Sequence, residues 1–110
     1  MDPNTQETDM EKIAILEVDV KVVAEGQRAS IIIGSYVYNS ADENIGFVDD
    51  LMIGEDNCVG YAILSVGGFL GLGSRLVAVE FDSLEFGEDR FYLPSATREE
   101  LKRLPKFDYN

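Results

Sequence analysis

The chain has 110 residues, of which 45% are hydrophobic, and its 21 acidic and 9 basic residues give a formal net charge of -12. This length suits a single globular domain, and the negative charge disfavours nucleic acids and anionic lipid surfaces as partners. There is no histidine and only one cysteine, Cys58. Histidine-dependent triads, the usual zinc sites and an intramolecular disulfide are therefore excluded, and we predict no cofactor and no metal site.

The first residues, 1–11, are polar and acidic, and we expect a disordered tail there, followed by one domain over 12–110. This start does not resemble a secretory signal, which needs a basic region before an apolar core. No apolar run approaches the roughly 20 residues of a membrane span. These features predict a cytoplasmic protein without a membrane partner.

From Ala14 to Ala24, aliphatic residues alternate with charged ones. This period of two predicts a half-buried strand, which we expect to pair with the rest of the sheet or with a second chain. A turn at 25–27 follows. The run from Ser30 to Gly34 fits either a continuing strand or one helical turn capped by Ser30, and periodicity does not separate the two in so short a segment.

A short strand is expected at 36–39, a loop of turn-forming residues at 40–44, and a longer strand from Ile45 to Ile53. The apolar positions of the longer strand change parity in its middle, where Asp49 and Asp50 stand. This shift predicts a β-bulge, with one of the two aspartates accepting hydrogen bonds from backbone amides.

The remaining chain predicts a strand from Cys58 to Val66 with a buried cysteine, a strand over 75–81 and a hairpin over 84–93. Thr97 and Glu100 have the spacing of a capping box, which starts a short helix that Pro105 ends. Phe107 and Tyr109 are expected to pack back on the domain. The pattern as a whole predicts an all-β fold, a small barrel of about six strands with a short C-terminal helix.

A glycine loop connects the strands at 58–66 and 75–81. Four glycines surround three large apolar residues there, and apolar side chains on a loop must pack on the domain or on a partner. We expect them to form a homodimer interface; the alternative is that the loop plugs an open barrel end within one chain. The strand that follows excludes a dinucleotide fingerprint, which needs a helix. The structural glycines are Gly67, Gly68, Gly71 and Gly73, and the interface residues are Phe69, Leu70 and Leu72.

Much of the chain, residues 28–107, resembles a PRC-barrel domain, the module of the photosynthetic reaction-centre H subunit and of a ribosome maturation factor. The run SVGGFLG at 65–71 carries the resemblance most clearly, and Glu80 departs from it because the family usually has proline there. The resemblance implies the fold and a docking or assembly role, as in the short stand-alone members, and it carries over no catalytic residue. The other similar segments are 28–30, 33–34, 37–39, 43–46, 48–51, 61–64, 76–79, 93–94, 96–97, 101 and 104–105.

These observations predict a non-enzymatic protein-binding or assembly module that self-associates as a homodimer and has a further, unidentified protein partner. One alternative is a protein that binds a small ligand or a cation. Another is a ribosome-assembly adaptor that grips a basic ribosomal protein. We expect no nucleic-acid partner, although four basic residues gather on and beside the terminal helix. They are Arg98, Lys102, Arg103 and Lys106.

Overall fold

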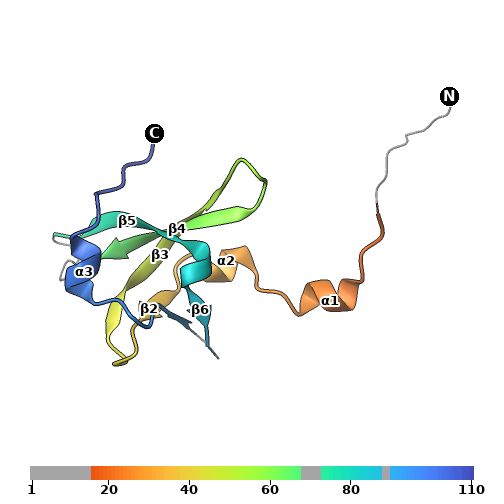
Figure 1. Cartoon of the computed structure of the whole chain (residues 1–110). Helices are drawn as coiled ribbons and strands as arrows, with labels where there is room; N and C mark the ends of the chain where they lie inside the picture. Colours follow the sequence, from red (N-terminus) through yellow and green to blue (C-terminus); the bar gives the residue numbers. More distant parts are fainter. Residues whose placement is uncertain (1–15, 68–72, 88–89) are drawn as a thin grey trace.

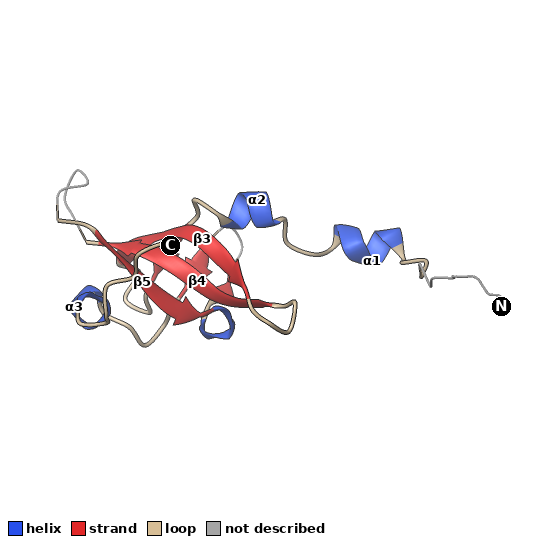
Figure 2. Ribbon diagram, turned by 90° about the horizontal axis from the view of Figure 1, so that it is seen from above, coloured by secondary structure: helices blue, strands red, loops and turns tan. Residues whose placement is uncertain are grey.

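The computed structural model describes residues 16–67, 73–87 and 90–110 of the chain. Its centre is a six-stranded sheet with the strand order β5-β4-β3-β2-β7-β6 (Figures 1 and 2). The all-β fold with about six strands and a short C-terminal helix is confirmed. In the described residues no pairing joins β5 to β6, so the sheet is open. The strands are β2 (Tyr36–Tyr38), β3 (Asn44–Ile53), β4 (Val59–Val66), β5 (Arg75–Glu80), β6 (Glu85–Phe86) and β7 (Phe91–Tyr92).

Strands β2 to β5 form an antiparallel meander, as the turn-forming segments between them predict. The register of β3 against β4 steps from Val48–Leu64 to Asp50–Ile63, so Asp49 has no partner and the predicted bulge is confirmed. The pairing of β3 with β2 shifts as well, around Ile45. Two irregularities in one strand increase its twist, and they bend β3 over the core.

The pairing of β2 with β7 is parallel and was not predicted. The β6–β7 hairpin returns to the edge of β2 that β3 leaves free. Beyond the paired residues, the Leu93 amide donates to the Tyr38 carbonyl oxygen at 2.8 Å and the Ser40 amide donates to the Pro94 carbonyl oxygen at 3.2 Å. Nothing in a two-residue strand such as β7 identifies a partner so distant in sequence.

The core lies on the concave side of the sheet, where α3 and the β6–β7 hairpin help to close it. Asn39 is the one polar residue among the buried side chains described. Its side-chain oxygen accepts from the amides of Ala41 and Glu43 at 3.0 Å each, which satisfies the polar group and fixes the β2–β3 turn. The buried hydrophobic cluster comprises Ile32, Val37, Ile45, Val48, Ala62, Leu64, Val66, Val77, Phe91, Leu93 and Leu101.

The ambiguous run before β2 is helical. The short helix α2 (Ala29–Ile32) places Ile32 in the core. Its N-cap is Arg28 rather than Ser30, and no side chain caps it. Gly34 follows with a φ of +97°, and its amide donates to the Val48 carbonyl oxygen at 2.7 Å. The left-handed conformation that glycine tolerates therefore turns the chain from α2 onto the sheet.

The predicted strand from Ala14 to Ala24 is wrong over the part that the structure describes. Residues 16–19 have no regular structure, and Val20–Ala24 form the helix α1, which has no buried residue. An alternating pattern becomes a strand when a neighbouring strand and a core face receive it. Here Asp19 caps a local helical turn instead, because its carboxylate accepts from the Lys21 amide at 3.0 Å. Figure 1 shows α1 projecting away from the sheet.

The helix α3 (Arg98–Lys102) begins as predicted with a capping box. Thr97 accepts from the Glu100 amide at 3.0 Å, and the Glu100 carboxylate accepts from the Thr97 amide at 2.9 Å. Leu101 from this helix is buried in the core. The helix therefore closes one end of the sheet, and its exposed residues lie beside the ends of β3 and β4.

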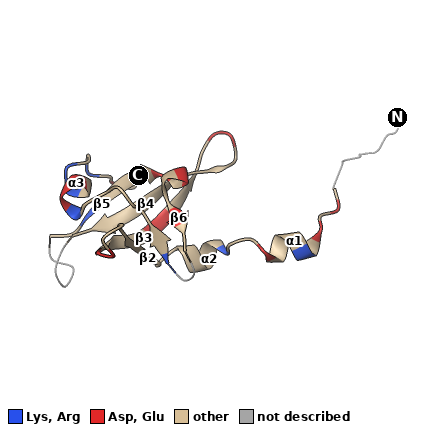
Figure 3. Cartoon of the chain, turned by 60° about the horizontal axis from the view of Figure 1, so that its bottom comes forward, with Lys and Arg blue, Asp and Glu red and all other residues tan. Residues whose placement is uncertain are grey.

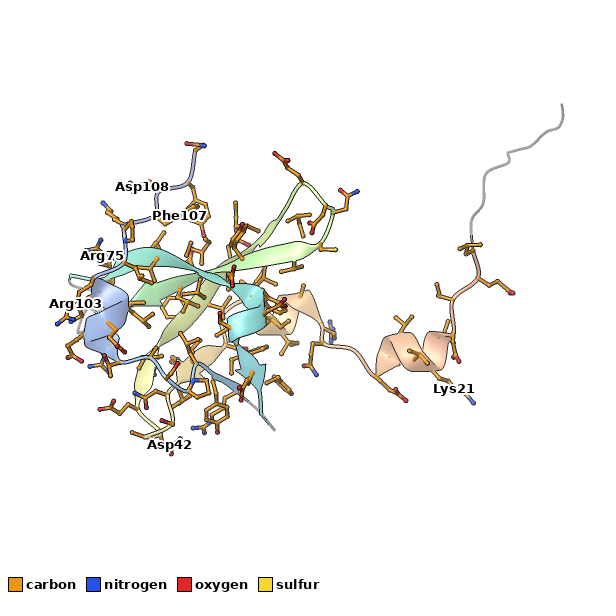
Figure 4. All side chains as sticks on the ribbon, viewed as in Figure 1. Lys21, Asp42, Arg75, Arg103, Phe107 and Asp108 are labelled. Atoms are coloured by element: carbon orange, nitrogen blue, oxygen red, sulfur yellow. The ribbon has the colours of Figure 1, made fainter. Side chains whose placement is uncertain are left out.

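The C-terminal segment after α3 packs back on the sheet, as predicted. Arg75 of β5 donates to the Leu104 carbonyl oxygen at 3.0 Å, and the Phe107 amide donates to the Leu76 carbonyl oxygen at 2.8 Å. Figure 4 shows Arg75 and Phe107 on the same side of the molecule, next to this segment. The tail thus satisfies part of the outer edge of β5, which would otherwise be open to other strands.

Candidate functional site

A groove of about 550 Å³ lies where β3, the end of β4 and α3 meet. It is lined by parts of the chain that are far apart in sequence, and each part is fixed by the fold described above. From the sheet it receives Tyr36, Asn44, Ile45, Gly46, Phe47 and Ser65; from the loop after β4 and from α3 it receives Gly67, Ser74, Arg98 and Lys102.

Two glycines allow the walls of the groove to come close. Gly46 has a φ of +152°, and a Cβ there would collide with the carbonyl oxygen of Ser65 on β4. Gly67 has a φ of +73°, and a Cβ there would lie 2.6 Å from Cε of Lys102. At Gly46 the two strands therefore approach to a distance that only glycine permits, whereas at Gly67 the flexible Lys102 side chain can move and the positive φ is what favours glycine.

The charge of the groove is opposite to that of the whole chain. Arg98 and Lys102 contribute two cations, and no carboxylate is among the described residues that line it. Arg98 Nη2 donates to the Asn44 carbonyl oxygen at 2.6 Å, which holds the guanidinium at the rim. Figure 3 shows both basic and acidic residues on α3, of which Arg98 and Lys102 line the groove, whereas acidic residues mark the turn between β3 and β4. This local reversal of sign favours an anionic ligand or segment.

Two aromatic side chains form the other wall. Tyr36 and Phe47 are directly paired across β2 and β3, so they lie on the same face of the sheet. They are 56% and 37% exposed, although large apolar side chains are usually covered. Aromatic surface beside two cations suits a ligand that carries both apolar and carboxylate groups.

The glycine loop is described only at its ends. Gly67 and Gly73 both adopt left-handed conformations, with φ of +73° and +74°. The other predicted loop residues, Gly68, Phe69, Leu70, Gly71 and Leu72, lie outside the described residues. Their place in an interface therefore stays a prediction. Since Gly67 and Ser74 line the groove, the loop begins and ends beside it.

The bulge aspartates are engaged within the chain. Asp50 accepts from the Leu51 amide at 2.8 Å, which is the backbone contact predicted for one of the pair. Asp49 accepts from the hydroxyl of Tyr109 at 2.7 Å. Partial burial of the phenol, this hydrogen bond and the negative charges of both aspartates raise the pKa of Tyr109. In the described part of the chain, no three cysteine, aspartate or glutamate side chains gather as metal ligands.

The prediction that Cys58 is buried is wrong, because the thiol is exposed. Strand β4 begins one residue later, and the Cys58 amide donates to Asp56 within the turn at 3.1 Å. The β3–β4 hairpin extends past the core at this end, as the exposure of Ile53 also shows. Cys58 therefore belongs to a solvated turn.

Sequence reasoning singled out Arg98 and Lys102 only as members of a basic cluster. It did not connect them with Tyr36 or Phe47, because only the β2–β3 register and the docking of α3 bring these residues together. Within the sequence, Tyr36 and Gly46 carry a weak local signal that they belong to a site. Position 46 shows it best, since a glycine inside a strand often marks a close backbone approach.

Among the helices that the structure describes, none has the length and apolar character to cross a membrane. A comparison with curated proteins finds no significant match. The sequence profile of the PRC-barrel domain matches residues 25–99, which is most of the chain and includes the whole sheet together with the start of α3. With the all-β fold, this match shows that the chain belongs to the PRC-barrel family.

Proposed function

We propose that this protein is a non-enzymatic binding and assembly module that self-associates through the end of the sheet where the groove and the glycine loop lie. The observation that carries the proposal is the groove itself. It combines two cations with exposed aromatic surface in a protein of net charge -12. Its described lining offers hydrogen-bond donors and apolar contacts, which suit the binding of a segment that carries both apolar and anionic groups.

The glycine loop extends this surface. The residues that flank it line the groove, and three large apolar side chains, Phe69, Leu70 and Leu72, fall between them in the sequence. A two-fold interface needs only one self-complementary patch. The groove, together with the apolar residues that the sequence places between Gly67 and Ser74, would supply such a patch.

Sedimentation velocity tests the self-association. We expect the wild type to sediment as a dimer, and the double change Phe69→Ser and Leu70→Ser to give a folded monomer with an unchanged circular dichroism spectrum. The control, Ile53→Ser with Tyr61→Ser, removes exposed apolar surface from β3 and β4 and should remain dimeric. A monomeric wild type, or a loop variant that unfolds, contradicts the proposal.

The volume of the groove favours a second candidate, a protein that binds a small anionic ligand. About 550 Å³ lies within the range of small-molecule sites. A thermal-shift screen with metabolites and metal ions separates the two candidates. A specific upward shift that Arg98→Glu abolishes supports the ligand reading, and no shift with any compound supports the assembly role.

A further inference from the structure

The segment before α2 carries apolar side chains that nothing in the described structure covers. We call residues 16–24 the N-terminal arm. Its five large aliphatic residues are between 61% and 78% exposed, and α1 within it has no buried residue. So many uncovered aliphatic side chains in one short segment mark a surface that binds something. They are Leu16, Val18, Val20, Val22 and Val23.

The arm is acidic as well as apolar. Over residues 16–20, Glu17 and Asp19 alternate with aliphatic residues, so this part of an extended arm presents aliphatic groups on one side and carboxylates on the other. Lys21 follows on the carboxylate side, which leaves the arm with one net negative charge. The helix α1 has only five residues, none of them buried, and such a short helix is marginal in water. The arm can therefore become extended on binding at small cost.

The groove described above has the complementary properties. Arg98 and Lys102 match the carboxylates of the arm, and Tyr36 and Phe47 match its aliphatic side chains. No carboxylate among the described lining residues opposes this pairing. Carboxylates are common in this chain, and the arm is distinguished from other acidic segments because it carries them beside exposed aliphatic side chains.

The arrangement of the fold shows which arm reaches which groove. Figures 1 and 2 place α1 and α3 at opposite ends of the molecule, so the arm points away from its own groove. Two copies that lie side by side in opposite directions bring the arm of each next to the groove of the other. This is a reciprocal two-fold arrangement, which closes on itself and uses one kind of contact twice.

We propose that the N-terminal arm of one copy docks in the groove of a second copy, with Glu17 and Asp19 facing Arg98 and Lys102. The inference rests on the proposed self-association, and it names the segment and the charges that hold the two copies together. It also gives the exposed aliphatic residues of the arm a cover that the isolated chain does not provide.

Charge exchange between arm and groove tests the proposal on the full-length protein. We compare dimer dissociation constants from sedimentation equilibrium for the wild type, for Glu17→Lys with Asp19→Lys, for Arg98→Glu with Lys102→Glu, and for all four changes together. Each pair alone should raise the dissociation constant at least about tenfold, because like charges then meet. The fourfold variant should return to within about threefold of the wild type, because opposite charges meet again.

Matched controls carry the same change in net charge at places outside the proposed contact. Glu55→Lys with Glu80→Lys matches the arm variant, and Arg103→Glu with Lys106→Glu matches the groove variant. Both should stay within about twofold of the wild type at 0.15 M salt, where distant exposed charges are largely screened. Circular dichroism confirms that every variant is folded.

Disulfide cross-linking shows whether the contact joins two chains. In a Cys58→Ser background, a mixture of Val18→Cys and Phe47→Cys chains should form a covalent heterodimer on mild oxidation. A mixture of Val18→Cys and Ile53→Cys chains should not, since Ile53 lies on the hairpin away from the groove. A chain that carries both Val18→Cys and Phe47→Cys should form cross-linked dimers rather than a monomer closed on itself.

The failures of the two proposals are distinguishable. If the wild type is a dimer but no charge pair alters its dissociation constant, the docked arm is refuted and self-association stands. If the doubly substituted chain closes on itself as a monomer, the arm occupies its own groove and the exchange between copies is refuted. A wild type that is monomeric at all concentrations refutes self-association and the docked arm together.

Discussion

The sheet and the N-terminal arm differ in how deeply their valine side chains are buried. In the sheet, Val37 and Val77 are completely buried, whereas in the N-terminal arm Val20 and Val22 are largely exposed. Both regions are rich in β-branched residues, and the arm has the alternation of aliphatic and charged residues that is typical of a strand, whereas Val77 stands in a continuous apolar run. The difference teaches that alternation specifies a strand only together with a neighbouring strand and a face to cover. The arm has neither in the single chain, and a local cap at Asp19 turns it into a helix.

The largest difference in the free energy of unfolding is expected when the same substitution, valine to alanine, is made once in the sheet and once in the arm. Val77→Ala removes two methyl groups from the core and should lower the free energy of unfolding by about 2.5 kcal/mol. Val22→Ala removes the same groups from the exposed arm and should change it by less than about 0.5 kcal/mol. Urea denaturation at a protein concentration low enough to keep the chain monomeric measures both values, because the proposed dimer would cover the arm. Equal losses would show that the arm packs as tightly as the sheet.

A glycine pair within the sheet gives the next largest effect. Gly46→Ala places a Cβ against the Ser65 carbonyl oxygen at a positive φ, and it should cost about 2 kcal/mol. Gly60→Ala on β4 meets nothing within 4 Å and should be neutral or gain up to about 1 kcal/mol. Thermal unfolding of the two variants compares them. A neutral Gly46→Ala would mean that β3 and β4 separate at the groove without cost.

Removal of the N-terminal caps of α3 and α1 compares the same two regions, with smaller expected changes in stability. Thr97→Ala removes the cap of α3, which is anchored in the core by Leu101, and should cost about 1 kcal/mol. Asp19→Ala removes the cap of α1, which has no buried residue, and in the monomeric chain it should leave global unfolding unchanged while lowering helical circular dichroism slightly. A cost for Asp19→Ala near that of Thr97→Ala would show that α1 unfolds together with the sheet.

The smallest effect concerns the C-terminal tail, a chain end that contacts the sheet where the arm does not. Tyr109→Phe removes the hydrogen bond to Asp49 and should cost at most about 1 kcal/mol at pH 7, while Tyr61→Phe serves as the exposed control outside the groove. Because the folded pKa of Tyr109 is raised, its contribution is fully present below the unfolded pKa near 10 and is lost as pH rises toward the folded value.

Denaturation at a series of alkaline pH values measures this linkage. Above about pH 10, the free energy of unfolding of the wild type should fall more steeply than that of Tyr109→Phe. Parallel curves for the wild type and Tyr109→Phe would show that the phenol ionises in the folded state as readily as in the unfolded state.

Local patterns predicted the parts of the fold that depend on local physics. The change of parity around Asp49 located the bulge, the spacing of Thr97 and Glu100 located the start of α3, and turn-forming residues located the hairpins. The parallel β2–β7 pair depends on contacts between distant segments of very short strands, which carry no local signal. The groove also depends on contacts between distant segments, so the sequence shows its residues but does not predict that they lie together.

The parallel pairing of β2 with β7 also sets an order of events during synthesis. Strands β2 to β5 can pair as soon as each leaves the ribosome, since each follows its neighbour closely in the chain. The outer edge of β2 must wait for β7, and at about 5–20 residues per second that wait lasts several seconds. The nascent chain thus carries an open strand edge for that time. Chaperone dependence of this protein should therefore concentrate in the interval between the emergence of Tyr38 and that of Phe91.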